Sequence, residues 1–278
     1  MRYFECRGYR LPLGRKTYIM GILNVTPDSF SDGGKYNTPG AALARAKKMV
    51  EEGADIIDIG GESTRPGFVE VDEEEELNRV LPVLELLVNE LDVPVSIDTR
   101  KGIVAEKVLD MGAHIVNDIW GLQGDRSMAK IAAKYNAGVI VMHNKAEKIY
   151  DNLLGEVKQF LAKSADIAQK LGISRNSIVI DPGIGFGKTF LHNLEILGRL
   201  EELGELGFPV LIGTSRKSFI GKILDLPVDE RVEGTAASVA IGIAKGADFV
   251  RVHDVKEMAR VARVSDSITR GWNEEVEG

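Results

Sequence analysis

The sequence is poor in the residues that usually bind metals or form disulfides. Its 278 residues include one cysteine, Cys6, and four histidines. A lone cysteine excludes an internal disulfide, and no HxH or HExxH spacing supports a catalytic zinc site. No apolar run approaches the roughly 18 residues that span a bilayer, and the start MRYFECRGYRLPLG lacks the apolar segment of a secretory signal. We therefore expect a cytoplasmic protein without a membrane partner.

Basic residues are also in the minority. The chain carries 35 Lys and Arg against 42 Asp and Glu, a net charge of −7. This balance disfavours nucleic acid or an anionic membrane as the main partner, so an anionic substrate would need a locally basic site. With 44% apolar and 28% charged residues, the composition is that of a globular enzyme-sized domain.

Short β-rich runs alternate with longer amphipathic runs about eight times along the chain. The runs are 18–24, 54–60, 93–98, 114–119, 138–144, 177–183, 209–215 and 248–254. Such alternation predicts a parallel sheet, and strands that are apolar on both faces favour a closed barrel over an open doubly wound sheet. We predict one α/β domain over 1–278, a (β/α)₈ TIM barrel, with residues 1–17 preceding the first barrel strand.

Two helix starts carry clear capping signals. Thr38 and Pro39 predict an N-cap and first turn for a helix that ends near Gly53, and Asp72 predicts the cap of a helix that extends to about Leu91. The acidic run 73–76 is then explained by the helix dipole and does not require a metal or a protein partner.

Polar residues gather where the predicted strands end. In a barrel of this type, that edge carries the active site. Asp58 and Asp118 could instead be helix caps, but capping does not explain the whole set. The set is Asn24, Asp58, Glu62, Asp98, Asn117, Asp118, Met142, His143, Asp181, Ser215, Arg216, Lys217, Arg251 and His253.

Several motifs in the same places form a recognisable series. Long loops rich in Gly, Pro, Ser and Asp follow the first and second strands, as binding loops often do. In chain order the motifs are NVTPDSFSDGG (24–34), GGESTRPG (60–67), SIDT (96–99), VNDI (116–119), DPGIGFGKT (181–189), GTSRKSF (213–219) and RVHDV (251–255). Together they resemble the dihydropteroate synthase family, which joins a dihydropterin pyrophosphate to p-aminobenzoate and releases pyrophosphate.

The resemblance implies a pterin pocket. A buried carboxylate can accept two donors from the guanidine-like edge of a pterin, and Asp181 is the best candidate for it. Arg251 offers a planar guanidinium that can stack on the heterocycle and reach a phosphate. The implied pterin-binding residues are Asp98, Asn117, Met142, Asp181, Phe186, Lys217 and Arg251.

The resemblance also implies a pyrophosphate site with Mg²⁺. Barrels commonly bind phosphate after their seventh and eighth strands, where Arg251 and His253 fall. Mg²⁺ on a pyrophosphate needs few protein ligands, and Asn24 is the expected one. The implied pyrophosphate-binding residues are Asn24, Arg65, Arg251 and His253.

For p-aminobenzoate, the resemblance implies a site formed by Phe30, Thr64, Arg65, Pro66, Lys217 and Ser218, with the carboxylate near Ser218. The implied reaction loses pyrophosphate first, and the arylamine then attacks a cationic methylene that Asp32 stabilises. The expected catalytic residues are Asp32, Arg65, Lys217, Arg251 and His253. A homodimer and a target of sulfonamides belong to the same expectation.

Rival hypotheses fit fewer residues. GIGFGKT (183–189) fails as a P-loop because Pro182 stands where glycine is needed, and it fails as GxGxxG at Lys188. Lys217 could form a Schiff base if Arg216 lowered its pKa, but the two long loops would then be unexplained. A corrinoid methyltransferase would not need STRPG or SRKSF, and a non-catalytic pterin-binding protein would not need Asn24, Arg65 and His253. One departure is the loop at 142–152, which leaves His143 and Asn144 without a role.

Overall fold

The computed structural model describes residues 2–26, 38–62 and 71–272. Eight parallel strands form one sheet in the order β8-β7-β6-β5-β4-β3-β10-β9. A parallel bridge between Ile180 and Val210 joins the two outer strands and closes the sheet into a barrel. The strands are β3 (Tyr18–Asn24), β4 (Ile56–Gly60), β5 (Val95–Asp98), β6 (Ile115–Asp118), β7 (Gly138–Met142), β8 (Ile178–Asp181), β9 (Leu211–Ile212) and β10 (Phe249–Val252).

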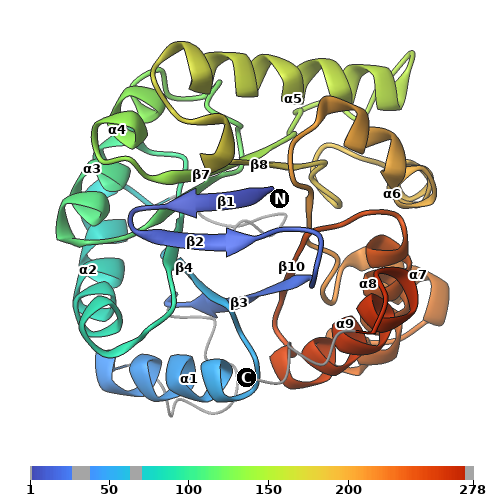
Figure 1. Cartoon of the computed structure of the whole chain (residues 1–278), viewed down its shortest axis with the longest axis horizontal. Helices are drawn as coiled ribbons and strands as arrows, with labels where there is room; N and C mark the ends of the chain where they lie inside the picture. The colour runs from blue at the N-terminus through green and yellow to red at the C-terminus, as the bar shows by residue number, and fades with distance from the viewer. Residues whose placement is uncertain (1, 27–37, 63–70, 273–278) are drawn as a thin grey trace.

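Helices follow the strands and surround them, as Figure 1 shows. They are α1 (Pro39–Glu51), α2 (Glu73–Glu90), α3 (Gly102–Met111), α4 (Met128–Lys134), α5 (Leu153–Lys170), α6 (Phe190–Gly198), α7 (Ser218–Leu224), α8 (Val232–Ala244) and α9 (Val255–Thr269), with 3₁₀ turns at Arg175–Ser177, Leu200–Leu206 and Val228–Glu230. The predicted (β/α)₈ barrel is confirmed. No helix of the described chain is both long and apolar enough to cross a bilayer.

The two predicted helix starts are also confirmed. The Thr38 side chain accepts a hydrogen bond from the Ala41 amide at the start of α1, and Asp72 accepts one from Glu75 at the start of α2. The dipole argument is incomplete for Glu76, because this side chain is buried and bonds Lys101 at 2.6 Å. Glu76 thus has a structural partner that its place in an acidic run did not indicate.

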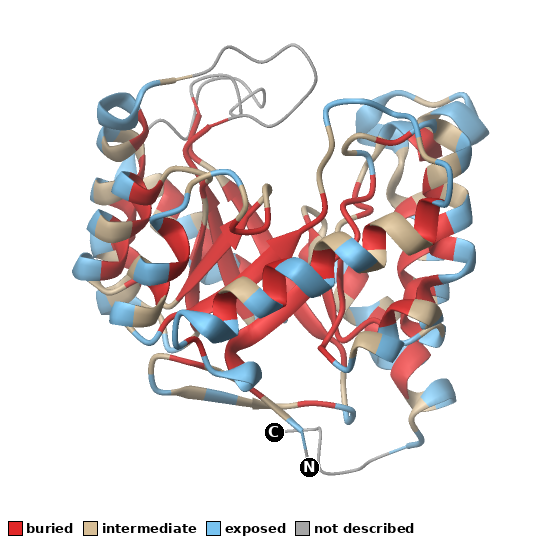
Figure 2. Cartoon of the chain, turned by 90° about the horizontal axis from the view of Figure 1, so that it is seen from above, coloured by how far each residue is buried: buried red, intermediate tan, exposed pale blue. Residues whose placement is uncertain are grey.

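Residues 1–17, expected only to precede the barrel, contain an antiparallel hairpin. Strands β1 (Tyr3–Cys6) and β2 (Tyr9–Pro12) lie across the end of the barrel where the parallel strands begin (Figures 1 and 2). Phe4 is fully buried, and its ring packs edge-on against Phe249 at 5.5 Å between centroids. The hairpin therefore closes the amino-terminal end of the barrel.

Inside the barrel, an apolar layer lies next to the hairpin. The alternation of side chains along a strand places every second residue in the interior. This layer comprises Phe4, Cys6, Leu13, Tyr18, Met20, Ile56, Ile115, Ile140, Val179, Leu211 and Phe249. On several strands, the next interior side chain, two residues further along, is polar. The barrel interior therefore changes from apolar to charged toward the carboxyl ends of the strands.

Candidate active site

Arg251 is the centre of the charged layer. From β10, its Nε donates to Asp58 Oδ2 at 2.6 Å and its Nη2 donates to Asp98 Oδ2 at 2.8 Å. Asp58 lies on β4 and Asp98 ends β5, so one guanidinium joins three strands. Asn117, which lies beside Asp98 in the register of β5 and β6, donates to Asp58 at 3.4 Å.

Two buried oxygens in this layer have no hydrogen-bond partner among the described residues. They are Asp58 Oδ1 and Ser96 Oγ, on register partners of β4 and β5. Buried polar atoms are normally paired with protein or ordered water. Their presence marks the layer as a place that can accept further hydrogen bonds.

Asp181 ends β8 on the opposite side of the site. Its Oδ1 accepts a hydrogen bond from the Gly183 amide at 2.7 Å, which fixes the carboxylate at the start of the GIGFG turn. Gly183 has a φ of 69°, and a Cβ there would come within 2.0 Å of the His143 carbonyl oxygen. Only glycine fits this position, so the turn after β8 packs directly against the His143 backbone after β7. Met142 is the register partner of Asp181.

The turn after β9 directs Lys217 and Arg216 to different partners. Arg216 adopts a φ of 57° and its guanidinium bonds Asp254 at 2.6 and 3.0 Å. Lys217 instead places Nζ 4.3 Å from the centre of the Phe186 ring. Lys217 is also the N-cap of α7, so Ser218 is the first helical residue and is exposed. Lys217, and not Ser218, therefore occupies the N-cap position of this helix.

Burial shifts the pKa values of the charged groups in this site toward neutral pH. It raises the pKa of Asp181 to about 6, although Gly183, Lys217, Lys188 and Arg251 oppose the shift. It raises the pKa of Asp98 to about 7 against the attraction of Arg251. Burial, and then Arg251, lower the pKa of Lys217 to about 8. Arg251, not Arg216, is thus the cationic neighbour that acts on Lys217.

His253 and Asn24 lie at the edges of this cluster. His253 Nδ1 lies 3.0 Å from Ser215 Oγ, and the His253 amide donates to the same oxygen at 3.1 Å. Asn24 ends β3, and a Cβ on neighbouring Gly60 would lie 3.3 Å from Asn24 Oδ1. The described residues contain no group of three His, Cys, Asp or Glu side chains that could hold a metal. Asn24 can thus supply one neutral oxygen ligand.

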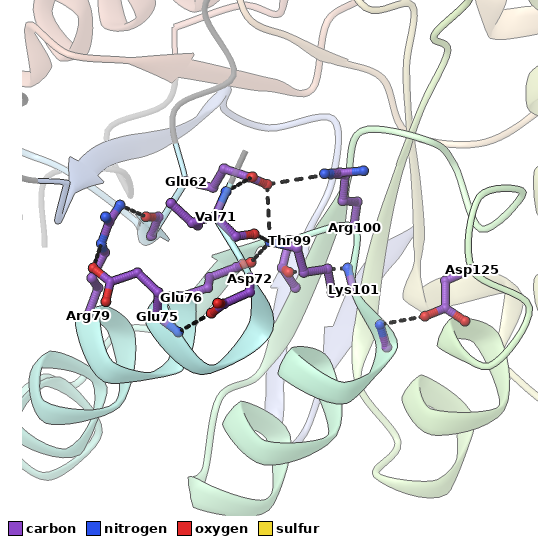
Figure 3. A network of polar contacts seen from close by, with 12 residues as sticks. Glu62, Val71, Asp72, Glu75, Glu76, Arg79, Thr99, Arg100, Lys101 and Asp125 are labelled. Carbon is purple, nitrogen blue, oxygen red and sulfur yellow. Dashed lines mark hydrogen bonds and ion pairs between the residues drawn. The ribbon is translucent and has the colours of Figure 1, made fainter. Parts of the chain in front are cut away.

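Five expected site residues, Phe30, Asp32, Thr64, Arg65 and Pro66, lie outside the described residues. The residues that bracket the segment 63–70 are described, and Figure 3 shows that they form a polar network. The Val71 amide donates to Glu62 at 3.0 Å, and Lys101 Nζ donates to the Val71 carbonyl at 2.7 Å. Arg79 donates to the Gly61 carbonyl at 3.0 Å. Side chains of α2 and of the start of α3 therefore hold both ends of this segment.

For three further residues, the structure adds to what the sequence indicated. Asp58 could have been a cap, but it is an interior partner of Arg251. Asp118 does bond its own turn, because its carboxylate accepts from the Trp120 and Leu122 amides at 2.8 and 2.7 Å. Lys188 was noted only for breaking a nucleotide motif, yet it is buried beside His143. Alternation along the strand that contains Ile56 could have identified Asp58 as an interior residue.

The sequence is similar to a known protein family and to several known proteins. Residues 20–253 match the family described as "Pterin binding enzyme". A dihydropteroate synthase of Clostridium beijerinckii is 54% identical over 259 residues, which cover 93% of this chain and 96% of that protein. The chain belongs to the dihydropteroate synthase family. A relative of the same name from Bacillus subtilis is 53% identical and covers 91% of this chain and 89% of its own length.

Solved structures of the dihydropteroate synthase family have the same fold. The Clostridium difficile enzyme, crystallised in the presence of pteroic acid, superposes with a TM-score of 0.91 at 53% identity and covers 94% of this chain and 99% of its own. The Xanthomonas albilineans enzyme with 4-aminobenzoic acid gives 0.91 at 40% identity, with coverages of 96% and 97%. Family membership makes this chain a transferase of folate biosynthesis. The resemblance that the motifs indicated is thereby confirmed.

Proposed function

We propose that the chain condenses 7,8-dihydropterin-6-ylmethyl pyrophosphate with p-aminobenzoate and releases 7,8-dihydropteroate and pyrophosphate. The observation that carries this proposal is the charged layer, in which Arg251 bonds Asp58 and Asp98 while Lys217 stands over Phe186. Relatives crystallised with pteroic acid and with 4-aminobenzoic acid support both substrate classes.

In this proposal the pterin lies among Asp98, Asn117, Asp181 and Lys217. An ionised Asp181 accepts from the amino and ring N–H groups, because these donors match a carboxylate in spacing. Asn117 can donate and accept, and Lys217 donates to the oxo side. Asp98, with a pKa raised to about 7, can accept or donate at neutral pH. Met142 and Phe186 supply the apolar walls.

The pyrophosphate is assigned to Arg251 and His253, with Asn24 as the protein ligand of Mg²⁺. Asn24 fits this role because it offers one carboxamide oxygen, while the pyrophosphate and water supply most of the oxygen ligands that Mg²⁺ prefers. The metal would neutralise charge on the departing pyrophosphate. Arg251 adds a charge fixed by two carboxylates, so it needs no reorganisation when the C–O bond breaks.

p-Aminobenzoate is assigned to the side of Lys217 and Ser218. The exposed Ser218 begins α7, next to the Lys217 ammonium, and both groups can face a carboxylate. In the proposed order, pyrophosphate leaves first and the neutral arylamine then attacks the cationic methylene. The roles expected for Phe30, Asp32, Thr64, Arg65 and Pro66 stay predictions, as do the homodimer and the cytoplasmic location.

The test is a direct assay. Purified protein is incubated with the dihydropterin pyrophosphate, p-aminobenzoate and Mg²⁺, while dihydropteroate and pyrophosphate are measured. We expect equal amounts of both products. Product formation should stop in EDTA, which removes Mg²⁺. It should also stop in Asp181→Ala and Lys217→Ala, because the pterin then loses charged hydrogen bonds. Asp166→Ala, in the exposed α5 pair Asp166–Lys170, is the control and should keep wild-type activity.

One outcome contradicts the proposal. If pterin binds but no condensation occurs, the chain is not a synthase, and transfer of a methyl group from methyltetrahydrofolate to a corrinoid protein becomes the next reaction to assay.

A further inference from the structure

Lys188 is a buried lysine directly behind the proposed pterin pocket. It lies seven residues after Asp181 along the chain, and only 3% of its surface is exposed. Its Nζ donates to the Phe186 carbonyl at 2.9 Å and lies 2.9 Å from His143 Nδ1. A buried ammonium is costly unless it is paired. These two contacts therefore make Lys188 a defined part of the loop and not an exposed cation.

His143 is fixed as the partner of this amine. Its ring is buried and packs edge-on against Phe160 at 4.9 Å between centroids. Burial and then the charge of Lys188 lower the pKa of His143 to about 3, so the ring is neutral and Nδ1 can accept from the amine. The His143 amide donates to the Asp181 carbonyl at 2.9 Å. This histidine, without a role in the sequence motifs, thus connects Lys188 to the strand that ends in Asp181.

The same amine reaches the pocket through Phe186. The Phe186 carbonyl accepts from Lys188, while the Phe186 ring lies under Lys217 Nζ at 4.3 Å. Lys188 also interacts electrostatically with Asp181 and Lys217. The contacts place Lys188 behind the aromatic wall of the pocket, and its charge acts on the Asp181 carboxylate.

We propose that Lys188 is a positioning residue for pterin recognition: its buried amine holds Phe186 in place, and its positive charge favours the ionised form of the Asp181 carboxylate. The inference rests on the proposed function, because it names what sustains the pterin-binding carboxylate. Lys188 acts through Asp181 and Phe186 and does not touch the substrate.

Lys188 and Asp181 affect each other's protonation. Burial lowers the pKa of Lys188 to about 7, and burial raises the pKa of Asp181 to about 6. The charge of Lys188 lowers the pKa of Asp181, and the charge of Asp181 raises the pKa of Lys188, so a protonated lysine opposes protonation of the carboxylate. Without Lys188, the pKa of Asp181 rises further, and a protonated Asp181 loses an acceptor for the pterin donors.

Other charges around this pair must be considered. Asp181 also faces Lys217 from the turn after β9 and Arg251 from β10, and both lower its pKa. Around His143, Lys145 lowers the pKa and Glu156 of α5 raises it. Asp98 on β5 acts on Lys217. All of these side chains remain when Lys188 is substituted, so the variants differ from the wild type in the Lys188 amine and in its effect on these neighbours.

The test measures the affinity for pteroic acid by calorimetry in the wild type, Lys188→Gln and Lys188→Met. Glutamine keeps a donor for the Phe186 carbonyl without the charge, and methionine keeps neither. At about pH 8.5, where the lysine is largely neutral, we expect Lys188→Gln to bind within about threefold of wild type. At about pH 6 we expect roughly tenfold weaker binding than wild type, because Asp181 is then protonated. Lys188→Met should bind more weakly than wild type at both pH values.

A merely structural role predicts parallel pH profiles for the wild type and Lys188→Gln, and that result would overturn the proposal. Lys134→Gln, in an exposed pair with Glu106, is the matched control and should follow the wild type. If Lys188→Gln unfolds, His143→Phe is used instead. The pKa of Asp181 is then measured by NMR from the ¹³Cγ resonance of its carboxyl group, which is assigned by its absence in Asp181→Asn. Removing the acceptor of Lys188 should raise the pKa of Asp181, and an unchanged pKa would count against the proposal. Failure of the wild type to bind pteroic acid would instead refute the proposed function.

Discussion

At the scale of single residues, the site depends on the shape of one guanidinium. Arg251 uses two different nitrogens for two carboxylates on different strands, and Asp58 and Asp98 raise its pKa although burial lowers it. A guanidinium can span two acceptors in a fixed plane, whereas an ammonium is a single point of charge. The position therefore requires arginine and not only a positive charge.

We expect Arg251→Lys to weaken pteroic acid binding by about tenfold or more, because one ammonium cannot hold Asp58 and Asp98 together. Arg199→Lys is the control, since Arg199 also bonds two carboxylates, Glu195 and Glu202, but at the exposed end of α6. Equal affinities in Arg251→Lys and the wild type, measured by calorimetry, would show that charge alone is sufficient.

At the scale of elements, the hairpin β1–β2 replaces solvent at the amino-terminal end of the barrel. Phe4 is fully buried, and a Cβ on Gly138 would lie only 2.7 Å from its ring. The glycine at the start of β7 thus makes room for an aromatic ring from a segment more than a hundred residues away. The apolar layer that results supports the charged layer above it.

We expect Phe4→Ala to lower the free energy of unfolding by roughly 3–5 kcal/mol, since it removes a large side chain from a packed layer. Tyr3→Ala, on the other face of the same strand and only partly buried, should cost about 1 kcal/mol or less. Urea unfolding measures both variants. Similar losses in the free energy of unfolding would show that the hairpin is only loosely attached and not packed into the barrel end.

Element boundaries and site contacts differ in how far they could be read from the sequence. The capped starts of α1 and α2 were predictable because Thr38, Pro39 and Asp72 act on their own helices. The hairpin was missed because its strands are short and its partners, such as Phe249, are distant in the chain. The pairing of Lys101 with Glu76 was missed for the same reason.

At the scale of the whole molecule, buried lysines make stability depend on pH in a definite direction. Lys188 and Lys217 have folded pKa values of about 7 and about 8, lowered from 10.5 mainly by burial. In the unfolded chain both regain the ordinary value, so between these limits the unfolded state binds more protons than the folded state. Stability then rises with pH.

Between about pH 7.5 and 8.5, we expect the free energy of unfolding to increase by about 1–2 kcal/mol. This window lies above the folded pKa of Asp98, about 7, and below the ordinary pKa of Cys6, 9.0. Burial raises the pKa of both groups, so their titration would lower the stability as pH rises, but outside this window. Urea unfolding at each pH measures the slope. In Lys188→Gln, the increase of the free energy of unfolding over one pH unit should be about 1 kcal/mol smaller than in the wild type. An unchanged slope would show that other groups cause the increase.

The sequence by itself determined the barrel, the family and the edge on which the polar residues lie. These follow from local patterns: alternation of strand and helix, capping residues, and motifs at the ends of strands. Tertiary structure decided which polar side chains become partners. Arg251 joins Asp58 and Asp98 because the sheet places β10, from the end of the chain, beside β3 and within reach of β4 and β5. Lys188 meets His143 in the loop after β8, where Gly183 lets the turn pack against the His143 backbone, and the resulting burial, which no local pattern encodes, shifts the pKa of both.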